Sequence, residues 1–253
     1  METPGAVAVF ITCLADLFAP EIGVSLVRVL RRAGLRVIFP RDQICCGQPA
    51  FNNGHVPEAR RIARRFISAF ERRLGPSDLI VAPSGSCALM VSHEYPRLFA
   101  GDPTWEPRAR AIAARTFEFS CFLANVLKVS SIDGRYPAKI TIHDSCHLNR
   151  GLGVHDEPRT LLRLCSGIEV VEMERSDQCC GFGGAFSIRQ PEISSSMVAD
   201  KLRCIRDTGA DAIVVNDTGC AMQIRGAMSR AGIELPVLHL AQVLDGALSR
   251  WTE

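Results

Sequence analysis

The sequence lacks a long, uninterrupted apolar run. Its first 20 residues, METPGAVAVFITCLADLFAP, are largely apolar, but no Lys or Arg precedes the apolar run and Asp16 interrupts it. A signal peptide needs a basic start, and a membrane helix needs roughly 20 apolar residues. No later stretch meets the second requirement. We therefore expect a cytoplasmic protein without a transmembrane segment, which leaves peripheral association with a membrane open.

An excess of charge of either sign is also missing. The 29 Lys and Arg residues nearly balance the 27 Asp and Glu residues, so the formal net charge is only +2. So small a charge gives no electrostatic argument for nucleic acid, and we expect no such partner. Six arginines between residues 60 and 73 follow a helical spacing, which predicts the solvated face of a helix.

Cysteine, in contrast, is abundant. The chain has eleven cysteines in 253 residues, and an odd number cannot be paired completely in internal disulfides. In a reducing compartment such cysteines serve as metal ligands or catalytic groups more often than as disulfides. The cysteine content therefore favours metal binding over a disulfide framework.

The sequence repeats itself, and the cysteines repeat with it. AVAVFITC, LRVIFP, DQICCG and DLIVAPSGSC in the first half correspond to AKITIHDSC, IEVVEME, SDQCCG and DAIVVNDTGC in the second. Cys13 precedes Cys45 by 32 positions and Cys146 precedes Cys179 by 33; Cys46 precedes Cys87 by 41 and Cys180 precedes Cys220 by 40. Three cysteines fall outside this pattern and read as structural thiols: Cys121, Cys165 and Cys204.

Each repeat alternates short strands with helices, which predicts parallel sheets built from βαβ crossovers. The expected strands are 7–12, 37–39 and 79–81 in the first repeat and 140–142, 168–172 and 213–215 in the second. We therefore predict an α/β fold of two Rossmann-like units related by a pseudo-twofold, with short parallel sheets flanked by helices. The predicted domains are 1–133 and 134–253.

The predicted strands bring distant cysteines to one edge of each sheet. In each repeat one cysteine follows the first strand, a Cys-Cys pair follows the second, and one cysteine follows the third. The carboxyl ends of parallel strands form the edge where ligands bind in open α/β sheets. The cofactor-binding candidates are Cys13, Cys45, Cys46 and Cys87 in the first repeat and Cys146, Cys179, Cys180 and Cys220 in the second.

Four converging cysteines suit either an iron–sulfur cluster or zinc. Adjacent cysteines are awkward ligands for one tetrahedral zinc, because neighbouring side chains diverge, and they suit a cluster with several irons better. The glycine after each pair allows a tight turn beside a bulky inorganic core. This reasoning favours iron–sulfur clusters held through the cysteines and keeps zinc as an alternative.

The motifs resemble a known family. The paired cysteine blocks, with the phrases CCGQPAFNNG, HDSCHLNRGLGV and CCGFGGAFS, resemble the twin cysteine-rich CCG domains of the heterodisulfide reductase B subunit and the glycolate oxidase iron–sulfur subunit. Over its whole length the chain is more similar still to the lactate utilization protein A family. This resemblance implies an iron–sulfur electron-transfer subunit that works with two further subunits, of B and C type, in a complex oxidising L-lactate to pyruvate.

One position in each repeat departs from the reductase pattern. Where each reductase block ends in Cys-x-x-Cys, this chain has Ser84 and Asp217 at the first cysteine position. We therefore expect an ordinary 4Fe-4S cluster in each repeat, or a cluster with an oxygen ligand from Asp217. His143 and His147 flank Cys146 and are candidates to stand beside the cluster, although His147 is as well explained by local packing.

Two other functions remain open. A reductase acting on a disulfide or quinone would use the clusters themselves for catalysis, which needs an iron left open at Ser84 or Asp217. A zinc-stabilised binding scaffold would use the same cysteines without redox chemistry. No single residue is predicted to be catalytic, so we expect a subunit of an oxidoreductase complex rather than an enzyme acting alone.

Overall fold

A computed structural model describes residues 5–249 of the chain. The chain divides into two compact units, Met1–Phe122 and Leu123–Glu253, and each is described by itself below. The domain boundary predicted after residue 133 differs from this division by the short segment 123–133, and it stays a prediction.

The first unit is built on a four-stranded sheet in the order β2-β1-β3-β4, with every pair of neighbours parallel. Its strands are β1 (Val7–Val9), β2 (Val37–Ile38), β3 (Leu79–Ala82) and β4 (Thr116–Glu118). Its α-helices are α1 (Cys13–Phe18), α2 (Pro20–Arg32), α3 (Gln48–Asn52), α4 (Val56–Glu71), α5 (Gly85–Leu89), α6 (Tyr95–Leu98), α7 (Trp105–Ala113) and α8 (Phe119–Cys121). A π-helical turn, η1 (Met90–Glu94), joins α5 to α6, and a second, η2 (Phe122–Val126), follows α8.

The second unit repeats this topology. Its sheet has the order β6-β5-β7-β8, again with parallel neighbours only. The strands are β5 (Arg135–His143), β6 (Ser166–Val170), β7 (Ala212–Val215) and β8 (Val237–Leu238). The helices are the π-helical turn η3 (His147–Gly151), α9 (Asp156–Arg163), α10 (Ala185–Arg189), α11 (Pro191–Asp207), α12 (Thr218–Arg230) and α13 (Leu240–Ser249).

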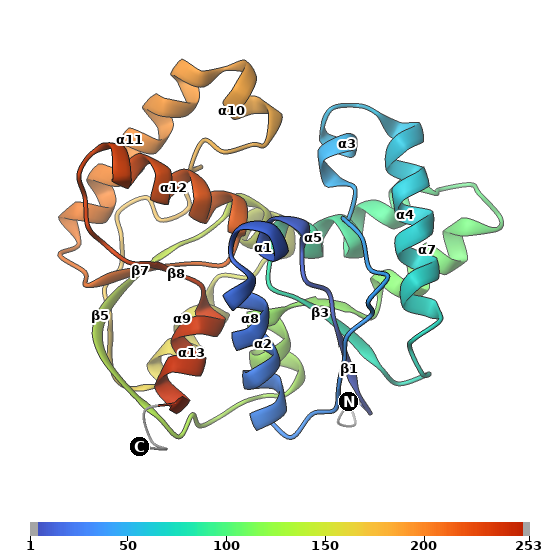
Figure 1. Ribbon diagram of the computed structural model, residues 1–253, viewed down its shortest axis with the longest axis horizontal. Coiled ribbons are helices and arrows are strands. Elements are labelled where there is room, and N and C mark those ends of the chain that lie inside the picture. Colours follow the sequence, from blue (N-terminus) through green and yellow to red (C-terminus); the bar gives the residue numbers. More distant parts are fainter. Residues whose placement is uncertain (1–4, 250–253) are drawn as a thin grey trace. The chain divides into compact units, whose positions relative to one another are not determined.

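Helices cover both faces of each sheet (Figure 1). In the first unit α4 packs on α7, and α2 lies on the other side of β1 and β3. In the second unit α11 packs on α12, and α9 and α13 pack together on the opposite side. Both faces of the central strands are thereby buried, which explains why β1, β3 and β7 are continuous apolar runs rather than alternating patterns.

The structure confirms the predicted fold class, an α/β chain with two parallel sheets flanked by helices. It adds a fourth strand to each sheet that the sequence did not reveal. β4 has three residues and β8 only two, which is too short for a run of apolar residues to stand out. Both are edge strands held by one neighbour, β3 and β7 respectively.

The segment 60–73, which comprises most of α4 and the two residues after it, has the predicted character. The six arginines at positions 60, 61, 64, 65, 72 and 73 are all exposed, while Ala59, Ala63, Phe66 and Phe70 of α4 are buried.

Within residues 5–249, no helix combines the length and the apolar character that crossing a bilayer requires.

An aromatic cluster fills the core of the first unit next to β1. The ring of Phe66 lies 4.7 Å from that of Phe10, 4.5 Å from that of Phe70 and 5.6 Å from that of Tyr95, measured between centroids. All four side chains are fully buried. Phe66 therefore connects α4 to β1 and to the segment that follows β3.

We predict that Phe66→Ala lowers the free energy of unfolding by about 3–5 kcal/mol, because it removes a buried ring and leaves a cavity. Chemical denaturation followed by circular dichroism measures the change. Phe39→Ala is the matched control, since Phe39 is 53% exposed and its loss should stay within about 0.5 kcal/mol. Equal effects of the two substitutions would contradict the packing described here.

Candidate metal centres

Both candidate sites lie where the topology of the sheet reverses. From β1 the chain crosses to β2 on one side and then returns to β3 on the other, and β5, β6 and β7 repeat this path. Loops leaving two neighbouring strands in opposite directions open a crevice at the carboxyl edge, which is the usual ligand site of such sheets. Each predicted set of cysteines follows these three strands.

The first site brings its four sulfurs together in two close pairs. The Sγ atoms of Cys13 and Cys45 are 3.5 Å apart, and those of Cys46 and Cys87 are 3.3 Å apart. Cys45 and Cys46 are also linked by a side-chain hydrogen bond, so the two pairs form one cluster. Cys46 and Cys87 are buried, whereas Cys13 and Cys45 are half-buried. The convergence predicted from strand order is present in the structure.

Hydrogen bonds hold the Cys-Cys loop of the first site in place. The hydroxyl of Tyr95 donates to the carbonyl oxygen of Cys46 at 2.9 Å, and the backbone N–H of Ile11 donates to Oε1 of Gln43 at 2.8 Å. Gly47 adopts φ 84°, a left-handed conformation that favours glycine, and its N–H points to Sγ of Cys45 at 3.4 Å. The cysteine-bearing loop is therefore fixed by groups outside the cysteines.

The second site has the same arrangement. Sγ of Cys180 lies 3.0 Å from Sγ of Cys220, and Cys179 shares side-chain hydrogen bonds with both Cys146 and Cys180. Cys180 and Cys220 are buried, and Cys146 and Cys179 are half-buried, as at the matching positions of the first site. The repeat found in the sequence is therefore a repeat of site geometry.

A different set of groups holds the loop of the second site. The ammonium of Lys201, fully buried on α11, donates to the carbonyl oxygens of Arg175 at 2.7 Å and Ser176 at 3.0 Å. Ser194 donates to the carbonyl of Gly181 at 2.8 Å. Gly181 has φ 82°, and a Cβ there would lie 2.7 Å from the carbonyl oxygen of Ser194, so glycine is required at this position.

The cysteines share protons in pairs. Hydrogen bonds from Cys13 and Cys46 lower the pKa of Cys45 to about 3, and the bond between Cys13 and Cys45 raises the pKa of Cys13. In the second site, hydrogen bonds from Cys146 and Cys180 lower the pKa of Cys179 to about 2. Each site thus holds a thiolate at neutral pH, the form that binds metal ions, and a bound metal would displace the remaining protons.

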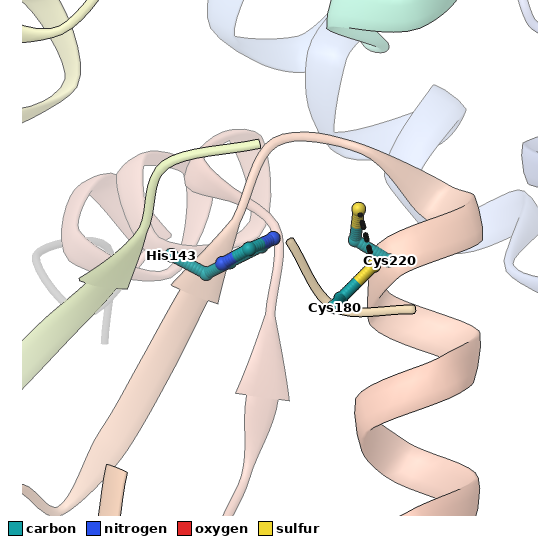
Figure 2. Close-up of side chains that lie close together, drawn as sticks. All are labelled: His143, Cys180 and Cys220. Carbon is teal, nitrogen blue, oxygen red and sulfur yellow. Dashed lines mark hydrogen bonds between the residues drawn. The ribbon is translucent and has the colours of Figure 1, made fainter. Parts of the chain in front are cut away.

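His143 joins the second site from the end of β5. One ring nitrogen of His143 and the Sγ atoms of Cys180 and Cys220 lie within 4.8 Å of one another, and all three side chains are buried (Figure 2). Burial lowers the pKa of His143 to about 4, and the charge of Lys201 acts in the same direction. The imidazole is therefore neutral and keeps a lone pair for a metal.

The remaining candidate residues lie close to the cysteines in different ways. Asp217 is the N-cap of α12, where its Oδ1 accepts a hydrogen bond from the N–H of Gly219 at 3.1 Å. Ser84 takes the corresponding place before α5, with its Oγ 3.2 Å from Oγ of Ser86. Nδ1 of the half-buried His147 is 3.6 Å from Sγ of Cys146. As side chains beside a metal centre, all three remain predictions.

A buried ion pair braces the strand end of the second site. Arg159 of α9 makes two parallel hydrogen bonds of 2.8 Å to Asp144, the residue after His143, and both side chains are at most 3% exposed. Arg159 also donates to Glu172 at 2.9 Å. The bidentate geometry fixes the backbone between β5 and Cys146.

Unsatisfied polar groups next to the cysteines fit a bound inorganic group. Among the described residues, buried polar atoms without a hydrogen-bond partner include Oγ1 of Thr12, Oγ of Ser145 and both ring nitrogens of His143. Thr12 directly precedes Cys13, and Ser145 directly precedes Cys146. Buried polar atoms of this kind can bind an ion or a water molecule. The thiolates together with these donors fit a metal centre rich in sulfur.

The three cysteines outside the repeat have different surroundings. Cys165 is 2% exposed at the end of α9, where burial raises the pKa of its thiol to about 11. Cys204 packs against the apolar core of the second unit. Cys121 lies in α8, and its N–H donates to the carboxylate of Glu118. The structural role expected for all three stays a prediction.

Several supporting residues were not found from the sequence. Lys201 had a usable signal, since it shares a helical spacing with the buried Val198 and Ile205 and so falls on the apolar face of α11. Nothing in the sequence around Tyr95 reveals its hydrogen bond to the carbonyl oxygen of Cys46. The pairing of Arg159 with Asp144 depends on how α9 packs, which no spacing encodes.

Comparisons with known proteins match the repeat. Residues 7–92 and 140–225 each match the CCG cysteine-rich domain. The chain is 44% identical over 239 residues to lactate utilization protein A of Bacillus velezensis, which covers 94% of this chain and 98% of the relative. The proteins of the same name from Bacillus licheniformis and Anoxybacillus flavithermus are 43% and 44% identical over the same shares of both chains.

A solved structure shares the fold. A hypothetical protein from Helicobacter pylori superposes with a TM-score of 0.62 at 11% sequence identity, over 97% of this chain. This chain spans 49% of the length of that protein. At this identity the likeness shows the fold alone.

We predict that Arg159→Met lowers the free energy of unfolding by about 3–5 kcal/mol, because it leaves Asp144 buried without its counter-charge. Arg163→Met is the matched control on the same helix, since that side chain is 60% exposed and 3.8 Å from Glu172; its effect should stay within about 0.5 kcal/mol. Chemical denaturation measures both, and equal losses would argue against the bracing role of Arg159.

Proposed function

This chain belongs to the lactate utilization protein A family, and from that premise we propose that it is the iron–sulfur electron-transfer subunit of a complex that oxidises L-lactate to pyruvate. The observation that carries the proposal is the pair of four-cysteine clusters, one at the carboxyl edge of each parallel sheet. The name of the relatives supports the metabolic role, and the cysteine geometry supports the redox role.

Iron–sulfur clusters can carry the electrons of this reaction one at a time. Oxidation of L-lactate to pyruvate releases two electrons and two protons, and an iron–sulfur cluster, when bound, accepts one electron at a time. The eight repeat cysteines hold such clusters, and the buried members of each set exclude water from one side of the centre. We assign Cys13, Cys45, Cys46 and Cys87 to one cluster and Cys146, Cys179, Cys180 and Cys220 to the other, each an ordinary 4Fe-4S cluster.

Two further subunits, of B and C type, complete the proposed complex. Every cysteine in the chain is free of disulfides, which suits a reducing cytoplasm.

A specific observation favours one competing function, a zinc-stabilised scaffold. Sulfur atoms around a tetrahedral zinc lie roughly 3.8 Å apart, given Zn–S bonds of about 2.3 Å. The close pairs of both sites, at 3.0–3.5 Å, are nearer to that spacing than to the wider separation of cysteine sulfurs that bind different irons of one cluster. Metal analysis separates the two functions, because only iron–sulfur centres carry inorganic sulfide.

We predict that the anaerobically purified protein is brown and contains iron and acid-labile sulfide. Cys45→Ser and Cys179→Ser should each remove about half of the iron and of the visible absorbance, because each substitution removes a ligand of one site only. Cys204→Ser is the control, since Cys204 lies in α11 and belongs to neither set of four repeat cysteines.

Either of two results would contradict this assignment. Protein that carries zinc without iron or sulfide would replace the electron-transfer function by the scaffold function. Iron retained in full by both Cys45→Ser and Cys179→Ser would show that the ligands lie elsewhere. If a variant is insoluble, the iron-to-protein ratio of the other variant still tests one site.

We also predict that lactate oxidation requires this chain together with its partners. Purified partner subunits, assayed with L-lactate and an artificial electron acceptor, should gain activity when the iron-loaded chain is added. The Cys45→Ser chain should give a small fraction of that gain, because loss of one centre interrupts the path along which the electrons travel. Full activity without this chain would exclude it from the path.

A further inference from the structure

His143 is a buried histidine without a hydrogen-bond partner. Its side chain is 1% exposed, and neither ring nitrogen has a partner among the residues that the structure describes. A buried imidazole in water-free surroundings normally satisfies at least one nitrogen, because an unsatisfied polar group costs about 1–3 kcal/mol. The unsatisfied ring of His143 therefore requires a binding partner that is neither a side chain nor a backbone group of this part of the chain.

The position of His143 points to that partner. A ring nitrogen of His143 lies within 4.8 Å of the Sγ atoms of Cys180 and Cys220, and Figure 2 shows the ring directed toward the two cysteines. His143 is the last residue of β5 and pairs with Val215 of β7, so its backbone is fixed by the sheet. A nitrogen and two sulfurs at this spacing can bind one metal centre.

The first site has no such nitrogen. Three residues before Cys13 stands Phe10, at the position that His143 occupies before Cys146. Phe10 is fully buried and packs edge-on against Phe66 and Phe70. The two repeats thus keep one cysteine skeleton but differ by one donor, a phenyl ring in one unit and an imidazole in the other.

We propose that His143 is a nitrogen ligand of the metal centre in the second unit, which it binds beside Cys180 and Cys220 as a fifth ligand from the protein. The first unit then holds its centre through sulfur alone, and the second through sulfur and one imidazole nitrogen. Imidazole is a good ligand for iron and coexists with thiolates in iron–sulfur centres. The proposal rests on the proposed function, since it assigns a ligand of the same centre.

His147 is the competing nitrogen. It also neighbours Cys146, and its Nδ1 is 3.6 Å from that sulfur. His147 is only half-buried, however, and it begins the turn η3, where water can satisfy its ring. The difference in burial favours His143 as the ligand and makes His147 a matched control within the same site.

The test is electron–nuclear double resonance on the reduced, iron-loaded full chain, prepared with ordinary histidine and with ¹⁵N-histidine. We expect a strong nitrogen coupling that changes with the isotope and belongs to one of the two centres. The coupling should disappear completely in His143→Phe, which installs the residue of the first site. It should persist in His147→Gln and in His93→Gln, whose side chain is exposed in the other unit.

A further variant guards against loss of folding. His143→Cys offers a thiolate in place of the imidazole, so it should keep its iron but lose the nitrogen coupling. Iron-loaded wild-type protein without any strong nitrogen coupling would overturn the assignment of His143, as would a coupling lost in His147→Gln and kept in His143→Phe. Protein that holds no iron would instead refute the proposed function itself.

Discussion

The architecture of each unit depends on bringing sulfur atoms from three strand ends to one edge of a parallel sheet. Like charges at 3.0–3.5 Å repel, so the thiols tolerate this spacing only by sharing protons or binding a cation. Neighbouring side chains hold the cysteine-bearing loops through hydrogen bonds. Tyr95 in one unit and Lys201 in the other hold the loop carbonyls, so that the cysteines stay converged while their own bonds are left for a metal.

The two units support their cysteines with different kinds of side chains. Around the first cluster the support is largely aromatic, with Phe10 packed beneath the strand end. Around the second it is charged, with a buried lysine and an arginine–aspartate pair whose desolvation must be offset by well-formed hydrogen bonds. A duplicated fold has thus been given two local environments, which allows two centres of the same kind to have different properties.

Much of this was readable from the sequence. The cysteine spacings and the apolar runs predicted two α/β units and the order in which the cysteines meet, because parallel strands leave little freedom in where their ends lie. The edge strands β4 and β8 were too short to be seen. The contacts of Arg159 and Tyr95 were also out of reach, since each joins elements whose packing depends on the whole core. His143 was visible as a candidate, but its missing partners became apparent only with its burial known.

The adjacent cysteines of each loop turn to different neighbours: Cys45 meets Cys13, while Cys46 meets Cys87. One dipeptide therefore ties the first strand end to the third, and all four sulfurs of the first unit have been synthesised before Cys146, the first of the second set. During translation the four cysteines of the first unit can therefore come together before the second unit has been synthesised. For the two clusters proposed here, insertion would therefore take place in two separate events, each within a single unit.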